Sequence, residues 1–317
     1  MAALIKRYWF LIALMAVFAL TLADGSNTLS SIGRWLKNRS GPDIVVVLIF
    51  IASGALLEIE QIKSGLKDVI GTIAALVVIF VIAPLTAMAF AQLPLETPVI
   101  IGIFLVAVMP TTLSSGVVMT GAAGGNTAHA LFITILANAL AVFIVPVALS
   151  MLLSLIGGSA TVTIDRWHMM VKLCSIVLLP LCGGMIVKYF ADSFCTRFAP
   201  KMQVFNQCLI LIIVWMGLSQ ARQAIIDGGN LIGEIILLAC LFHGVLLVAA
   251  GGIAYIFGIG RGRRESLIFM GAQKTLPLSI ILQVALFPLY GQALVYCVVH
   301  HIVHLMMDGY LVGKIKA

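Results

Sequence analysis

Long apolar segments recur along the chain and are separated by short polar ones. Ten of them approach the length of about 20 residues that a helix needs to cross the hydrocarbon core of a bilayer, and they cover 8–23, 43–59, 67–91, 97–121, 126–156, 167–190, 203–220, 230–258, 264–287 and 291–313. A signal peptide is the alternative for the first segment, because Lys6 and Arg7 precede its apolar run. The pattern predicts an all-α membrane protein with about ten transmembrane helices.

Composition supports a membrane environment. The 317 residues are 62% hydrophobic and 10% charged, with a mean hydropathy of +1.16. Soluble domains contain about 45–50% apolar and about 25% charged residues, so a water-soluble core cannot hold this excess. The six cysteines form no C-x-x-C pair, which argues against a disulfide framework and a thiolate metal site.

The net charge of +7 comes from basic residues scattered singly through short loops, which does not suggest nucleic-acid binding. With ten helices both termini share a side. Twelve lysines and arginines fall on that side and five on the other, while Lys172 and Lys274 lie inside predicted spans. The positive-inside rule then predicts cytoplasmic termini, most simply in a bacterial inner membrane.

A displacement of 163 residues relates the two halves of the chain. It carries Gly54 and Gly65 onto Gly217 and Gly228, and Thr112-Leu113 onto Thr275-Leu276. Five helices per half is an odd number, so the second half enters the membrane in the opposite sense. We expect two inverted repeats, residues 1–157 and 165–317, an architecture common in secondary transporters.

Polar interruptions occur at corresponding depths of the two halves. The fourth span contains Pro110, Thr111, Thr112, Ser114, Ser115 and Gly116, and the ninth contains Gln273, Lys274, Thr275 and Pro277. Proline removes a backbone donor, and a polar cluster is costly in lipid unless it faces protein or water. Two packing kinks are the alternative, but matched interruptions favour a transport site with discontinuous helices.

These residues resemble the bile acid:sodium symporter superfamily, in particular its SBF-like branch. The resemblance rests on residues 109–120 (MPTTLSSGVVMT), on Gly124-Gly125-Asn126 and on residues 271–276 (GAQKTL), and it extends over essentially the whole chain. It implies a panel domain of helices 1, 2, 6 and 7 and a core domain of helices 3–5 and 8–10. Helices 4 and 9 would cross in the core, and a small organic-anion substrate would bind between the domains.

The resemblance also implies a sodium site that this chain keeps only in part. The family's ligands fall near Ser115 and on Thr134 and Gln273, but its glutamate falls on Phe269. Asn126 and Asn138 complete the set of candidate binding residues. No cofactor is implied, and the coupling ion, Na⁺ or H⁺, stays open.

Lys274 is the main departure from the family pattern. A charge at the centre of a transmembrane helix is expensive and is functional by default. We hypothesise that its ammonium takes the place of a cation and bonds Thr111, Thr112, Ser115 or Asn138, or attracts a substrate carboxylate. The alternative is a structural charge that locks the crossing by bonding carbonyl oxygens.

The last span carries His300, His301, His304 and Asp308. A metal site would need a further ligand, so we favour a polar face turned to the protein interior, with proton relay as another reading. No H-E-x-x-H or G-x-S-x-G motif indicates an enzyme. The sequence thus predicts a secondary-active carrier; the alternative is a non-transporting regulatory membrane protein that keeps the carrier fold.

Overall fold

The computed structural model describes the chain except residues 1, 58–67, 157–164, 228–230 and 317. Every regular element in those described parts is helical. The first half contains α1 (Ala2–Leu22), α2 (Thr28–Asn38), α3 (Gly41–Leu56), α5 (Val69–Val77), the π-helix η1 (Val78–Ile82), α6 (Ala83–Phe90), α7 (Thr97–Val108), α8 (Ser115–Ala122) and α9 (Thr127–Ser154). The second half contains α10 (Arg166–Leu173), the π-helix η3 (Cys174–Leu178), α11 (Leu179–Phe190), α12 (Asp192–Asp227), α13 (Ile232–Ile256), α14 (Arg263–Ala272), α15 (Leu276–Leu286) and α16 (Gly291–Lys316).

The all-α prediction is confirmed for the described residues, in which each predicted apolar segment is largely helical. By length and composition, seven helices in the described residues are candidate membrane spans, and eight if the bent pair α2–α3 counts as one. Within the repeat argument, Gly65 and Gly228 lie outside the described residues.

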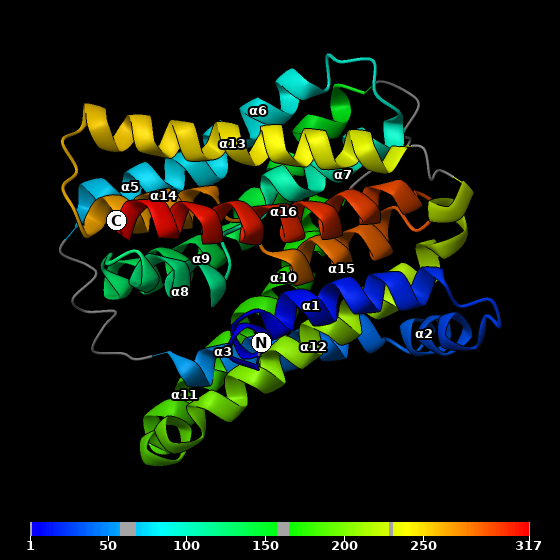
Figure 1. The fold of residues 1–317 in the computed structure, drawn as a ribbon, viewed down its shortest axis with the longest axis horizontal. Coiled ribbons are helices and arrows are strands. Elements are labelled where there is room, and N and C mark those ends of the chain that lie inside the picture. Colours follow the sequence, from blue (N-terminus) through cyan, green and yellow to red (C-terminus); the bar gives the residue numbers. More distant parts are fainter. Residues whose placement is uncertain (1, 58–67, 157–164, 228–230, 317) are drawn as a thin grey trace.

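The helices gather into two groups. Figure 1 shows α5–α9 and α13–α16 together, with α1, α2, α3, α11 and α12 along the opposite edge. Contacts agree, since α3 packs on α11 and α12, while α16 packs on α7 and α13. Helix α12 joins the groups through α15 and α16. In the span Arg263–Leu286, 94% of the most apolar 18-residue stretch is buried, so other helices enclose this span.

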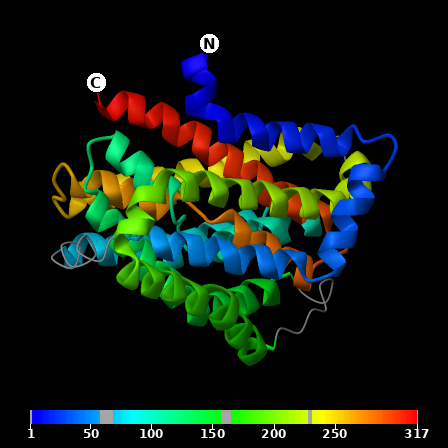
Figure 2. The ribbon, with the colours of Figure 1, turned by 90° about the horizontal axis from the view of Figure 1, so that it is seen from below.

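Helix α2 is an element that the sequence analysis did not predict. It meets α3 at 76° and lies across its end (Figure 2). The turn before α2 is held by Asp24, whose carboxylate accepts the N–H (2.9 Å) and hydroxyl (3.0 Å) of Ser30. The Ser30 N–H is the main reason that the pKa of Asp24 lies below its usual value. Arg222 donates to the carbonyls of Thr21 (3.0 Å) and Leu22 (3.1 Å), which fixes this turn against α12.

Gly54 on α3 and Gly184 on α11 allow these two helices to pack backbone against backbone. A Cβ on Gly184 would overlap the Ile51 carbonyl and lie 2.9 Å from the Gly54 Cα, whereas a Cβ on Gly183 would meet nothing within 4 Å. Small residues permit this kind of close approach between membrane helices.

We therefore expect Gly184→Ala to destabilise the protein by about 1–3 kcal/mol through overpacking. The neighbouring Gly183→Ala is the matched control and should be neutral or slightly stabilising, because alanine favours the helix. Thermal unfolding of both variants in detergent measures the difference. Equal melting temperatures would show that the helices can separate without cost.

Candidate functional site

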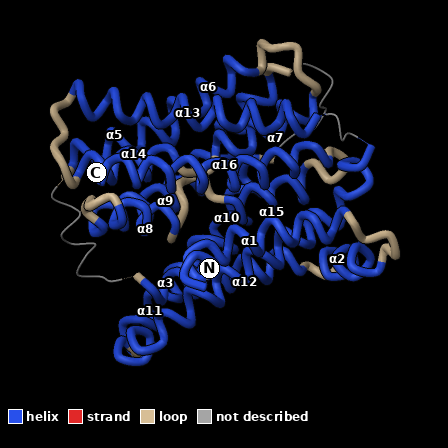
Figure 3. The backbone as a smooth tube through the Cα atoms, viewed as in Figure 1, coloured by secondary structure: helices blue, strands red, loops and turns tan. Residues whose placement is uncertain are grey.

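The helices are interrupted at both places where the sequence predicted breaks. Helix α7 ends at Val108 and α8 begins at Ser115; α14 ends at Ala272 and α15 begins at Leu276. Figure 3 shows loop segments within the interior of the bundle. Met109 and Gln273, which follow the two helix ends, both have extended backbone.

The two breaks contact each other directly. The Thr275 N–H donates to the Pro110 carbonyl over 3.0 Å. Pro110 has no N–H to continue the α7 hydrogen-bond pattern, and Pro277 occupies the first turn of α15, where a missing donor costs nothing. The prolines thus account locally for where the first half-helix stops and the second starts.

A side-chain network joins the breaks. The Gln273 Oε1 atom accepts from the hydroxyls of Thr112 (2.7 Å) and Ser115 (2.8 Å). The Thr112 Oγ1 atom also accepts the Gly116 N–H at the start of α8 (3.0 Å). Gly116 leaves room for this contact, because a Cβ there would lie 2.7 Å from the Met270 sulfur and 3.2 Å from Gln273 Oε1.

Lys274 lies where the two breaks meet, which we call the crossing, and 2% of its surface is exposed. Its ammonium donates to three carbonyls: Ile79 (2.7 Å), Ala107 (2.9 Å) and Met109 (3.0 Å). These bonds use all three ammonium protons. The expected bonds to Thr111, Thr112, Ser115 or Asn138 are therefore not formed, and the carbonyl-locking alternative describes the contacts.

Local backbone structure explains why these carbonyls are available. Ala107 lies in the last turn of α7 and Met109 directly follows the helix, where carbonyls have no partner in the next turn and carry partial negative charge. Ile79 lies in the π-helix η1, where the Ala83 N–H bonds to Val78, five residues back. The next donor in that pattern would be residue 84, which is proline. Lys274 supplies the donor that Pro84 lacks.

The other candidate residues lie at varying distances from this network. Thr134 donates to the Ala130 carbonyl (2.9 Å) and reaches the Thr112 carbonyl at 3.5 Å. Asn138 donates to the Thr134 carbonyl (2.9 Å). The Thr111 hydroxyl and the Asn138 Oδ1 atom are buried and have no hydrogen-bond partner within the described parts of the chain.

Ser114 and Asn126 lie at helix starts. Ser114 is exposed at the beginning of α8, beside the half-buried Ser115. Asn126 caps α9 by accepting the His129 N–H (3.1 Å) and bonds through its own N–H to Gly262 (2.8 Å). Its observed contacts therefore belong to the α8–α9 and α13–α14 turns rather than to the crossing.

Sequence reasoning missed the partner of Gln273. The Gln273 amide donates to Asp308 Oδ2 over 2.6 Å, and Asp308 Oδ1 lies 2.9 Å from His243 Nε2. Asp308, His300 and His304 are buried, which confirms that this face of α16 is turned inward. An acidic residue inside a span was the available signal, but pairing it with α13 required the fold.

A model of the SBF-like CPA transporter family matches residues 8–317 of this chain. The chain belongs to that family. It is a transporter family rather than an enzyme family, in agreement with the absence of catalytic motifs noted above.

Individual relatives of this SBF-like protein are distant. The chain is 26% identical over 284 residues to the Probable sodium/metabolite cotransporter BASS4, chloroplastic, of Arabidopsis thaliana, covering 84% of this chain and 64% of the relative. It is 25% identical over 320 residues to the protein of that name from Oryza sativa subsp. indica, covering 95% of this chain and 74% of the relative. It is 27% identical over 220 residues to Sodium/bile acid cotransporter 7 of Xenopus tropicalis, covering 67% of this chain and 61% of the relative. The chain thus spans less than two thirds of the first and third relatives.

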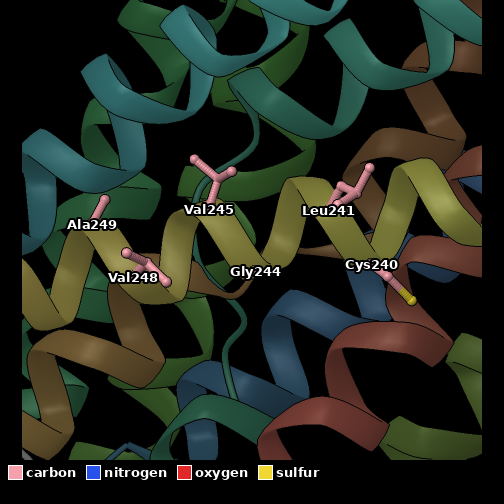
Figure 4. Close-up of a pocket in the computed structure, with 6 residues that line it drawn as sticks. All are labelled: Cys240, Leu241, Gly244, Val245, Val248 and Ala249. Atoms are coloured by element: carbon pink, nitrogen blue, oxygen red, sulfur yellow. The ribbon is translucent and has the colours of Figure 1, made fainter.

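One surface hollow of this SBF-like chain lies away from the crossing. It is a shallow apolar groove whose six lining residues all belong to α13 (Figure 4). Leu241, Val245 and Ala249 lie along one edge of the helix and Cys240 along the opposite edge. None of the candidate binding residues lines it, and its apolar character fits a surface covered by lipid chains.

Proposed function

We propose that this protein is a secondary-active carrier that moves a small organic anion by alternating access. The observation that carries the proposal is the meeting of two interrupted helices, held by Gln273 and by one buried ammonium. Interrupted segments at corresponding positions of two halves are the recurring form of carrier sites near the middle of the bilayer. Membership of a transporter family supports the same reading.

The anion preference rests on charge at the crossing. All three acceptors of the Lys274 ammonium are neutral carbonyl oxygens. A ligand carboxylate could approach along the exposed Ser114 and half-buried Ser115, at the start of α8, where the helix end favours negative charge. Thr111 and Asn138 supply further polar atoms without internal partners.

The proposed architecture has ten spans in two inverted repeats, residues 1–157 and 165–317. The group of α1, α2, α3, α11 and α12 would belong to the panel and the group of α5–α9 with α13–α16 to the core, and the separation of these groups in Figure 1 supports the assignment. Rocking of one group against the other would expose the crossing to each side in turn. We place the protein in a bacterial inner membrane with both termini in the cytoplasm.

Counterflow into proteoliposomes tests the proposal. Purified full-length protein is reconstituted in vesicles loaded with a high concentration of one unlabelled anion, and uptake of the same labelled anion is followed, for a panel of monocarboxylates, dicarboxylates and a bile acid. Saturable uptake above that of protein-free vesicles is expected for at least one compound, with and without sodium. No uptake over the whole panel would favour the non-transporting regulatory alternative.

A further inference from the structure

A histidine and an aspartate form a buried pair beside the crossing. His243 on α13 and Asp308 on α16 have side chains with 0% exposure, and His243 Nε2 lies 2.9 Å from Asp308 Oδ1. Gln273 donates to the other carboxylate oxygen at 2.6 Å. Acidic side chains inside membrane proteins are rare and commonly serve ion or proton pathways.

The donors around Asp308 define the resting proton arrangement. Gln273 uses its carbonyl oxygen to accept from Thr112 and Ser115, so its NH₂ group faces Asp308. An ionised carboxylate accepts this bond and a second one from an Nε2–H of His243. One hydrogen bond network therefore connects the carboxylate to the hydroxyls at the break between α7 and α8.

The pair can accept one more proton. With Nε2–H directed at Asp308, the remaining lone pair of His243 is on Nδ1, which is buried and has no hydrogen-bond partner in the described structure. The His304 ring lies 5.7 Å from the His243 ring and 4.5 Å from the His301 ring, centroid to centroid. Both His304 nitrogens also lack partners among the described residues. The rings of His301, His304 and His243 thus follow one another from His301 to Asp308. Imidazole is the side chain best suited to pass protons near neutral pH.

Charge balance links this proton to an anion. In the described part of the crossing, the Lys274 ammonium and the Asp308 carboxylate are one buried positive and one buried negative charge, and Lys274 donates to carbonyls and not to Asp308. A proton on His243 adds one uncompensated positive charge in a medium where such a charge is costly. A monoanion bound at the crossing cancels it, so each ligand makes binding of the other more favourable.

The surrounding elements contribute few other ionisable groups. Helices α5, α6, α7, α8 and α15 and the π-helix η1, which pack against α13 or α16, contain none, and α12 approaches α16 where Gly217 faces Leu294. Ionisable groups on the elements that carry or adjoin the pair include His300, His301, His304, Tyr296 and Cys297 on α16, Cys240 on α13, Lys274 at the crossing, and Glu265, which pairs with Arg264 (2.8 Å) at the start of α14.

We infer that His243 and Asp308 form a proton-binding site that couples proton movement to anion movement in the same direction. The inference rests on the proposed carrier function. The proton binds His243 Nδ1 when the site faces one side of the membrane and leaves the same atom when the site faces the other side. Asp308 and Gln273 connect His243 to the crossing by hydrogen bonds, so the change of charge is felt there.

Proton-driven accumulation tests the coupling. Vesicles are given a pH gradient of one unit, alkaline inside, without sodium and with the membrane potential held at zero, and the labelled anion that counterflow identifies is added outside. One proton per anion gives about tenfold accumulation, since one pH unit is about 1.36 kcal/mol. Asp308→Asn keeps the shape of the side chain but cannot hold the charge, and it should give no accumulation above the external level. Asp43→Asn, in a half-exposed pair with Lys172 (3.5 Å), is the matched control and should accumulate the anion like the unaltered protein.

Two results would overturn the inference although counterflow works: no accumulation by the unaltered protein, or equal accumulation by Asp308→Asn. Failure of counterflow with every anion is a separate failure of the carrier function. In that case ¹⁵N NMR of histidine-labelled full-length protein decides. The resonance that disappears in His243→Gln should move to an imidazolium position on acidification of the unaltered protein and stay neutral in Asp308→Asn; an unchanged resonance in the unaltered protein would refute the site.

Discussion

Lys274→Met is expected to abolish anion counterflow and to lower the melting temperature. The carbonyls of Ile79, Ala107 and Met109 lose their donor. Each buried carbonyl left without a donor lowers the stability by about 1–3 kcal/mol. Removing a charge from the middle of the membrane raises the stability by about 2.5–3.5 kcal/mol. The net expectation is a loss of roughly 3 kcal/mol. Counterflow and thermal unfolding in detergent measure the two effects.

Lys172→Met is the matched control for this change. The Lys172 side chain is 33% exposed and pairs with Asp43 at 3.5 Å. Exposed ion pairs contribute little, about 0–1 kcal/mol, so both readouts should stay close to those of the unaltered protein. If Lys274→Met carried the anion with unchanged pH and sodium dependence, the ammonium would be a structural lock with no part in coupling or binding.

Gln273→Leu is the second change with a large expected effect. Leucine removes the acceptor shared by Thr112 and Ser115 and the donor to Asp308 Oδ2. Buried Thr112 and Asp308 and half-buried Ser115 each lose a partner; at about 1–3 kcal/mol for each buried group, a destabilisation of roughly 3 kcal/mol or more is expected. Because the link between carboxylate and crossing is broken, proton-driven accumulation should also be lost.

Gln203→Leu on the exposed side of α12 gives the comparison, since it makes the same chemical change away from the crossing. Thermal unfolding of both variants, followed by uptake under a pH gradient, separates stability from coupling. Equal melting temperatures of the Gln273→Leu and Gln203→Leu proteins would mean that the network contributes nothing to the stability of the fold. Accumulation at the unaltered level would mean that coupling does not pass through Gln273.

The sequence by itself determined that this chain is helical and bound to a membrane, because apolar length and the scarcity of charge are properties of the chain alone. It also located the two interruptions, since proline and clustered hydroxyl residues break helices wherever they stand in the fold. Lys274 and Asp308 were identifiable as costly charges inside spans for the same reason.

Only the tertiary structure decided what these charges bind. The Lys274 acceptors come from two other helices, and one of them, Ile79, is available because a π-helix precedes Pro84. Asp308 meets His243, which lies 65 residues away in the chain. A main-chain carbonyl leaves no trace in side-chain sequence, and the pairing of distant helices depends on how their surfaces pack. For that reason the sequence could indicate that partners exist, but their identity required the fold.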